Sequence, residues 1–228
     1  MKHIITSLII GISLLLATDL IIHKTDGTTV SIPIGNIESI TFGVDNVSCG
    51  TVTDIDGNIY QTVQIGDQCW MAENLKVTHY NDGSEIPTGY SNSAWGNLST
   101  GAYTVYNDDP SNTDVYGNLY NWYTVEDERG VCPADWHVPS DDEIKELEMY
   151  LGMSQEEADN TGYRGTNEGS KLAGRADLWN DGALENNPEF GTSGFDFLPG
   201  GYRNDYSGGY SGMDTGYFWS STEYSNLT

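Results

Sequence analysis

The chain has 228 residues and a formal net charge of −25, with 34 acidic residues against nine Lys and Arg. This length fits one domain with appendages or two small domains. The strong negative charge disfavours nucleic acids and anionic membrane surfaces as partners, because both would repel the protein. So many acids indicate a solvated surface, as in many secreted proteins, rather than a set of calcium sites. The 27 Gly residues predict a fold rich in turns.

The first 17 residues have the pattern of a secretory signal. Lys2 supplies a positive charge, and a mostly apolar run from Ile4 to Leu16 ends beside the small residue Ala17. The run is shorter than the roughly 20 residues that a membrane-spanning helix needs. We therefore expect residues 1–17 to be removed on export, leaving the mature protein extracellular or on the cell surface. No later segment is apolar enough to predict a membrane span.

Residues 18–45 are expected to form a short β segment or linker. Residues 20–23 have extended character, and the Asp-Gly pair at 26–27 is a turn signal. Residues 30–34 then alternate apolar with other side chains, which is the period of a strand. A Gly-, Asp- and Asn-rich boundary follows, and the main domain is predicted to cover residues 46–228.

A β-hairpin is predicted near the start of the main domain. Its expected parts are a turn at 56–58, a strand at 59–65, a second turn at 66–67 and a returning strand at 68–71. Ile59, Val63 and Ile65 share one face of the first strand. The turn also resembles the start of a calcium-binding EF-hand loop. The twelfth position counted from Asp54 is Ile65 instead of the Glu such a loop requires, so the turn interpretation is preferred.

Export makes the three cysteines disulfide candidates. Cys49 and Cys69 flank the predicted hairpin, which can bring them within bridging distance. Closing a loop of this size stabilises a fold by about 3 kcal/mol in the chain-entropy model. Cys132 is then unpaired. It is either a free thiol or the partner of a cysteine beyond residue 228.

The middle of the chain is irregular. Residues 80–118 are rich in Asn, Asp, Ser, Gly and Tyr, and loops of this length in a compact domain are usually functional or mobile. Residues 118–125 follow as a Tyr- and Trp-rich segment that we expect in the core.

A helix is predicted after Pro139. Ser140 and Glu143 have the spacing of a capping box, in which each satisfies a free backbone N–H at the helix start. Ile144, Leu147 and Leu151 then form one apolar stripe. The predicted helix ends at the glycine that follows Leu151.

Shorter elements are predicted in the last third of the chain. Ser154 and Glu157 repeat the capping spacing, so a second short helix is expected to run to Asn160. Residues 170–173 predict another helical turn. The Gly-rich remainder predicts loops, with short strands near 195–198 and 217–221.

Several phrases taken together resemble one family. They are DIDGNIYQTVQIGDQCWMAENLKV from Asp54, GNLYNW from Gly117, CPADWHVPSDDEI from Cys132, RGTNEGSKLAG from Arg164, FGTSGFDFLPGGYR from Phe190 and FWSSTEY from Phe218. In order and spacing they resemble the Fibrobacter succinogenes major paralogous domain, a family of exported bacterial surface proteins. The resemblance covers about residues 49–228.

This family is similar to the C-type-lectin-like superfamily, which also includes formylglycine-generating enzymes. The resemblance implies an α+β domain with a small twisted antiparallel sheet, one or two short helices and long loops. It further implies that such domains continue beyond the FWSSTE phrase, through more strands to a cysteine near the end. On this reading the chain is truncated at its C-terminus, and the missing part carries the partner of Cys132.

Catalytic patterns are not visible in the sequence. The four histidines lack the spacing of a zinc site, and no serine lies in a nucleophile-elbow motif. His137 lies between Trp136 and Val138 and is interpreted as a structural residue. Paired carboxylates of a glycoside hydrolase are set by space, so 34 acids offer no defined pair. The copper-binding cysteine pair of formylglycine-generating enzymes is not found here.

One phrase bears on metal binding. Trp179, Asn180 and Asp181 resemble the calcium-site phrase of sugar-binding C-type lectins, which makes Asn180 and Asp181 weak metal candidates. The matching Glu-Pro-Asn is not present. Calcium is the one cofactor that the sequence raises.

Aromatic residues in the loops are the candidates for ligand contact, since a Trp or Tyr ring can stack on a sugar. They are Trp95, Tyr103, Tyr106, Tyr206 and Tyr210. The competing interpretation places four other tryptophans in the core, namely Trp70, Trp122, Trp136 and Trp219. The sequence thus predicts a surface domain that binds a glycan or a protein. The alternatives are a purely structural surface module and, last, an enzyme of the formylglycine-generating type.

Overall fold

The computed structural model describes residues 19–23, 28–33 and 49–223. The chain divides into two compact units, Met1–Asp45 and Asn46–Thr228. Within the described ranges, no helix has both the length and the apolar character needed to cross a membrane. The predicted signal at residues 1–17 and the predicted turn at 26–27 lie outside the described residues.

The first unit contains one antiparallel pair of strands. β1 (Asp19–His23) pairs with β2 (Thr29–Pro33), and Ile21 lies opposite Ser31. The extended stretches that the sequence predicts here are therefore confirmed as strands.

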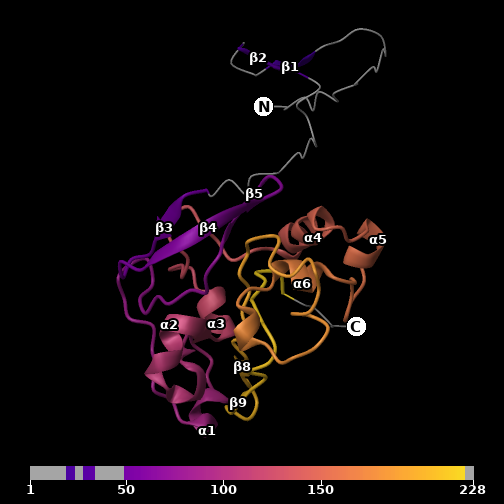
Figure 1. Cartoon of the computed structure of the whole chain (residues 1–228). Helices are drawn as coiled ribbons and strands as arrows, with labels where there is room; N and C mark the ends of the chain where they lie inside the picture. Colours follow the sequence, from indigo (N-terminus) through magenta and orange to yellow (C-terminus); the bar gives the residue numbers. More distant parts are fainter. Residues whose placement is uncertain (1–18, 24–27, 34–48, 224–228) are drawn as a thin grey trace. The chain divides into compact units, whose positions relative to one another are not determined.

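The second unit combines small antiparallel sheets with short helices (Figure 1). Its elements in chain order are β3 (Thr51–Thr53), β4 (Ile59–Ile65), β5 (Gln68–Met71), α1 (Asn92–Trp95), β6 (Tyr103–Thr104), η2 (Tyr106–Asp108), η3 (Pro110–Asn112), α2 (Thr113–Tyr116), β7 (Leu119–Tyr120), α3 (Trp122–Val125), α4 (Asp141–Tyr150), α5 (Gln155–Ala158), α6 (Glu168–Leu172), η4 (Ala176–Leu178), β8 (Tyr202–Arg203) and β9 (Tyr210–Ser211). The α+β class is confirmed. The resemblance implied one or two short helices, and the described residues contain six, five of them with only four or five residues.

The three-stranded sheet has the order β3-β4-β5. The first part of β4 pairs with β3 and buries Tyr60. The second part, which begins at Thr62, pairs with β5 and buries Thr62, Val63 and Ile65. The buried face therefore changes in mid-strand. Ile59 shares the face of Val63 and Ile65 by strand period, but it is 61% exposed, whereas those two residues are buried.

The helix α4 covers this sheet. Ser140 accepts a hydrogen bond from the backbone N–H of Glu143, whose carboxylate accepts one from the N–H of Ser140, so the predicted capping box is confirmed. Ile144 and Leu147 are buried on one helix face, and Leu151 follows them. These side chains form one hydrophobic cluster with the buried residues of β4 and β5, the sheet-helix cluster.

The two smaller helices α5 and α6 were predicted in the right places, but their ends differ from the predicted ones. α5 has the predicted capping box of Ser154 and Glu157, but it ends at Ala158 instead of Asn160. α6 begins two residues before the predicted helical turn, at Glu168. The buried Glu168 carboxylate accepts hydrogen bonds from the N–H groups of Thr166 and Asn167. Although burial raises its pKa, these bonds lower the pKa of Glu168 overall.

A second hydrophobic cluster lies under the long irregular segment. It consists of Val77, Tyr80, Ile86 and Val131. Helices α1, α2 and α3 gather at this end of the unit, and α4, α5 and α6 at the other (Figure 1). Because Tyr80 and Ile86 of the irregular segment are buried in this cluster, the segment is part of the packed interior of the unit.

The two short strands predicted near the C-terminus are wrong. Residues 195–197 make a single parallel bridge, between Phe197 and Ala173. Asp196 has a φ of +54°, which interrupts an extended run. Residues 217–221 pair with no strand among the described residues, and β8 and β9 are the strands that form instead.

Candidate functional site

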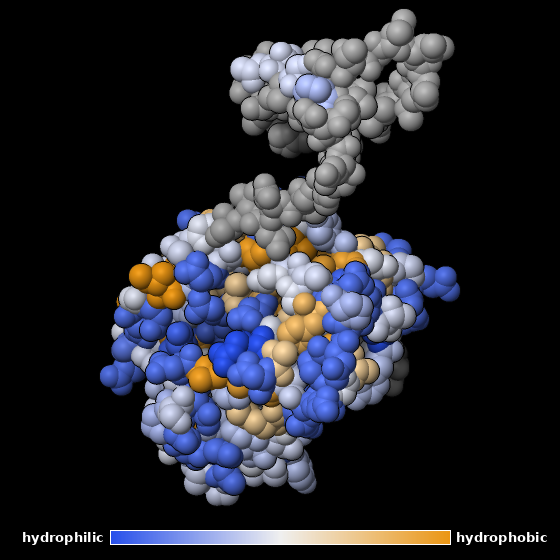
Figure 2. Space-filling model, in the orientation of Figure 1, coloured by the Kyte–Doolittle hydropathy of each residue, from blue (hydrophilic) through white to orange (hydrophobic). Residues whose placement is uncertain are grey.

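A groove of about 480 Å³ opens on the surface of the second unit. Its lining is mostly apolar and aromatic, and it comes from residues 68–75, from the loop before α4, from residues 195–197 and from residues 218–219. Stretches far apart in sequence therefore meet in one concave site, as is typical of ligand sites. On the face shown in Figure 2, apolar patches (orange) reach the surface between hydrophilic residues (blue).

Aromatic rings form a continuous path along the groove. Trp70 on β5 packs against Phe195 with ring centroids 5.6 Å apart. Phe195 contacts Phe197, and Phe197 contacts Phe218 edge-on at 5.4 Å. Such tilted ring pairs contribute stabilising energy in addition to that gained by burying their apolar surface. The path leads from the interior at Trp70 to the partly exposed Phe218, so the groove has an apolar wall that reaches solvent.

The four tryptophans predicted in the core differ in burial. Trp70 is buried at 9% exposure, and Trp122 and Trp136 are half-buried. Trp219 is 44% exposed, so its prediction as a core residue is wrong for the described structure. Its ring packs on Trp122 at 5.8 Å, and its indole N–H donates to the carbonyl oxygen of Tyr120.

Acidic residues border the apolar wall. Glu73, Asp135, Glu143 and Asp196 all line the groove, whereas its lining contains no Lys or Arg. Burial raises the pKa of Asp196; the charge of Arg175 opposes this effect and the charge of Glu73 adds to it. The groove is therefore an apolar surface with an anionic rim.

His137 belongs to this rim. Its Nε2 lies 2.8 Å from the Glu143 carboxylate, and its side chain is 69% exposed. Hydrogen bonds from Ser140 and from His137 hold the pKa of Glu143 below its usual value. Since the same carboxylate caps α4, this contact joins the rim to the helix start.

The disulfide between Cys49 and Cys69 is present, with Cα atoms 6.1 Å apart, as the hairpin predicted. Cys69 lines the groove. Cys132 is a free thiol that also lines the groove and packs against the second hydrophobic cluster. Burial raises the pKa of its thiol to about 11, so it is a weak nucleophile at neutral pH.

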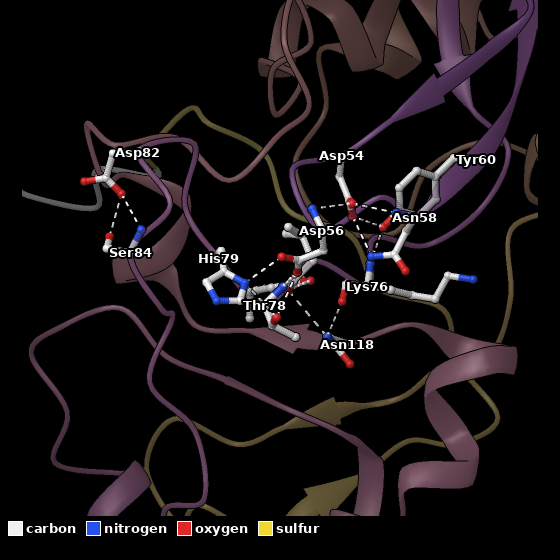
Figure 3. A network of polar contacts seen from close by, with 12 residues as sticks. Asp54, Asp56, Asn58, Tyr60, Lys76, Thr78, His79, Asp82, Ser84 and Asn118 are labelled. Carbon is white, nitrogen blue, oxygen red and sulfur yellow. Dashed lines mark hydrogen bonds and ion pairs between the residues drawn. The ribbon is translucent and has the colours of Figure 1, made fainter.

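A polar network around the β3-β4 turn was the other arrangement that could carry chemistry (Figure 3). The carboxylate of Asp54 accepts hydrogen bonds from the N–H groups of Asp56 and Asn58, from the Asn58 amide and from the Tyr60 hydroxyl. These donors fix the turn and occupy both carboxylate oxygens. The turn interpretation, preferred over a calcium loop, agrees with this geometry.

Asp56, Thr78 and His79 adjoin this turn and contain the residue types of a catalytic triad. His79 Nδ1 lies 2.5 Å from Asp56 and 3.1 Å from the Thr78 hydroxyl, and this hydroxyl donates to Asp56. A triad needs the nucleophile and the acid on opposite ring nitrogens of the histidine. Both contacts here use Nδ1, so the network holds the loop and does not activate Thr78.

The five loop aromatics predicted to contact ligand are placed unevenly. Trp95 and Tyr106 are buried at 5% and 9% exposure, Tyr103 and Tyr210 are half-buried, and Tyr206 is 93% exposed. None of them lines the groove. They are thus divided between the interior and a separate surface.

Arg203 explains the burial of several of these rings. Its guanidinium lies 4.4 Å from the Trp95 ring centroid and 4.8 Å from that of Tyr210. It also donates hydrogen bonds to the carbonyl oxygens of Tyr90 and Gly208. A cation between two aromatic faces, with its donors satisfied, stabilises the loops around it.

The two weak metal candidates lie on an exposed loop. The Asn180 amide donates to Asp214, and Asp181 accepts from the Asn186 amide. No group of three or more His, Cys, Asp or Glu able to hold a metal ion occurs within the parts of the chain that the structure describes.

The groove was not predicted as a site from the sequence. Its aromatic residues are spread over several of the quoted phrases, with pairs of rings in GFDF and FWSSTEY that were a usable signal. From the sequence these residues were predicted in the core or in strands, because their common position around one groove depends on how distant segments pack.

These features define an α+β domain with short elements, long structured loops and an aromatic groove. The chain belongs to the Fibrobacter succinogenes major domain family, whose model matches residues 63–228. The match contains all residues that line the groove. No curated protein and no solved structure matches the chain.

Proposed function

We propose that this protein is an exported ligand-binding or adhesion domain of the cell surface, and that the groove is its binding site. The observation that carries the proposal is an open, apolar hollow walled by aromatic rings. Exposed apolar surface of this kind marks sites where proteins bind other molecules.

The proposed location rests on the sequence. The N-terminal pattern of a positive residue, an apolar run and a small residue is that of a secretory signal. A disulfide between Cys49 and Cys69 suits an oxidising compartment. The high negative charge keeps an exported protein soluble.

The proposed fold is C-type-lectin-like. Small antiparallel sheets, helices on one side of β4 and β5, and loops that carry buried residues support it. The aromatic groove supports binding through apolar contact with its ring wall. Such binding does not require a calcium-dependent sugar site at Asn180 and Asp181.

An enzyme of the formylglycine-generating type is the least supported alternative. The described histidines with carboxylate partners, His79 and His137, have no hydroxyl or thiol on their second ring nitrogen. Cys132 lies in the groove as a single thiol of raised pKa, which does not suit a nucleophile.

Binding to a glycan array and to a random-peptide array, with and without a chelator, tests the proposal. We expect binders whose affinity falls at least tenfold in Phe218→Ala, because this ring ends the aromatic wall of the groove. We expect chelator to have no effect, because the groove wall is aromatic.

Tyr206→Ala is the matched control. It removes a ring that is 93% exposed outside the groove, so binding should persist. If Tyr206→Ala abolishes binding and Phe218→Ala does not, the loop aromatics are the site and the groove is not. If no compound on either array binds, the purely structural module is the better account.

A further inference from the structure

The groove runs along an unpaired sheet edge. β5 pairs with β4 on one side, and no strand pairs with its other side within the described parts of the chain. Half of the backbone N–H and C=O groups of such an edge strand point away from the sheet. All four residues of β5 line the groove, from Gln68 to Met71. An extended polypeptide in the groove can therefore hydrogen-bond to β5 as an added strand.

The walls of the groove beside β5 fit the alternating side chains of a bound, extended polypeptide. Side chains of an added strand point by turns to either face of the sheet. On one face they meet the path of rings from Trp70 through Phe195 to Phe197. Apolar residues at every second position of the ligand would bury against these rings.

The rim adds a preference for charge. Asp135 and Asp196 line the groove without a hydrogen bond or ion pair among the described residues, and the charge of Arg175 acts on Asp196 from outside the lining. Both also hold a positive φ, +68° and +54°, which positions their carboxylates through an uncommon backbone conformation. With Glu73 and Glu143 nearby and no Lys or Arg in the lining, the groove complements a basic ligand.

From these observations we infer that the ligand is an extended segment of a partner polypeptide that adds to the edge of β5, with alternating apolar residues and a Lys or Arg facing Asp135 and Asp196. This inference rests on the proposed function and names the chemistry of its ligand. The strand edge favours a polypeptide over a glycan, because only a polypeptide supplies the backbone N–H and C=O groups that complete a ladder.

A random heptapeptide library displayed on phage and selected on the full chain tests the inference. We expect enriched peptides to alternate apolar residues and to contain Lys or Arg. Binding of the best peptide should then slow the hydrogen exchange of those amides in residues 68–71 that point away from β4. A version of that peptide N-methylated at alternate positions should bind at least tenfold more weakly, since it cannot donate to β5.

Two charge variants test the rim. Asp135→Asn and Asp196→Asn keep the side-chain shape, and Asn tolerates the same positive φ. Each should weaken binding of the best basic peptide by about threefold to fivefold, with smaller losses at high salt. Asp181→Asn is the matched control, since it removes one exposed acid outside the groove.

The outcomes separate this inference from the proposed function. If binders need Phe218 but leave the β5 amides unprotected, or if only glycans bind, the groove binds ligand and strand addition is wrong. If enriched peptides lack basic residues, the role of the rim is wrong. If the coding sequence continues past Thr228 and the longer product no longer binds the peptide, the chain itself fills the groove, which overturns the assignment to a partner.

Discussion

The two ends of the main unit are held together in different ways. The helical region, consisting of β4, β5, α4 and α6, is joined by the sheet-helix cluster of apolar side chains. The loop region, consisting of residues 80–118 with β8 and β9, surrounds Arg203, which donates to the nearby carbonyl of Gly208 and to the carbonyl of Tyr90, 113 positions away. Local apolar periodicity can organise the first region. The second combines the second hydrophobic cluster with polar contacts between residues about a hundred positions apart, so part of its stability depends on a few polar groups.

Arg203→Ala should have the largest effect and test this contrast most directly. It leaves the carbonyl oxygens of Tyr90 and Gly208 without their donor and removes the cation from between Trp95 and Tyr210. We expect a loss of about 4 kcal/mol in the free energy of unfolding, measured by urea denaturation. Arg175→Ala, which removes an exposed ion pair with Asp177, should leave stability unchanged. Equal effects of the two variants would show that Arg203 does not organise the loops.

Leu147→Ala tests the helical region. Leu147 is 1% exposed at the centre of the sheet-helix cluster, so its truncation leaves a cavity and should cost about 3 kcal/mol. Thermal and urea unfolding measure the loss. Glu146→Ala, on the exposed face of the same helix, should be close to neutral. A small effect of Leu147→Ala would mean that α4 is not packed on the sheet.

Ser140→Ala tests how much the N-cap of α4 contributes to stability compared with the N-cap of α5. The variant removes the side chain that accepts the N–H of Glu143 at the start of α4 and should cost about 1 kcal/mol. Ser154→Ala removes the equivalent cap from α5, which has only four residues, and should cost less. Thermal melts of both variants measure the difference. A neutral result for Ser140 would contradict the capping assignment.

Cys132 lies where the groove meets the second hydrophobic cluster, and its pH dependence has the smallest expected effect. Burial raises the pKa of its thiol from an ordinary value near 9 to about 11. The folded state therefore holds this proton more tightly than the unfolded state. The stability that the neutral thiol contributes is complete below pH 9 and is lost as the pH rises through about 11.

Two measurements follow from this titration. The rate of iodoacetamide alkylation of the folded protein should stay low up to about pH 9 and rise towards pH 11. In Cys132→Ala the fall of stability between pH 9 and 11 should be smaller than in the wild type. Rapid alkylation at pH 7 would show that the thiol is not buried in solution.

The elements with local signals were predicted well. The hairpin of β4 and β5, its disulfide and both capping boxes follow from residues close together in sequence. The predicted strands near 195–198 and 217–221 failed, because a strand exists only with a partner and the sequence does not name one. The burial of Trp95 was not predicted, because Arg203, which covers its ring, is more than a hundred residues away in sequence.

The sequence by itself determined the class of the fold, the family, the β4-β5 hairpin and the capped starts of α4 and α5. Capping, turn chemistry and apolar period determine the local elements because they act over a few residues. The tertiary structure decided which aromatics are buried and that Trp70, Phe195 and Phe218 share one groove. It did so because burial depends on contacts between distant segments, and a loop residue receives its environment only when the whole chain is in place.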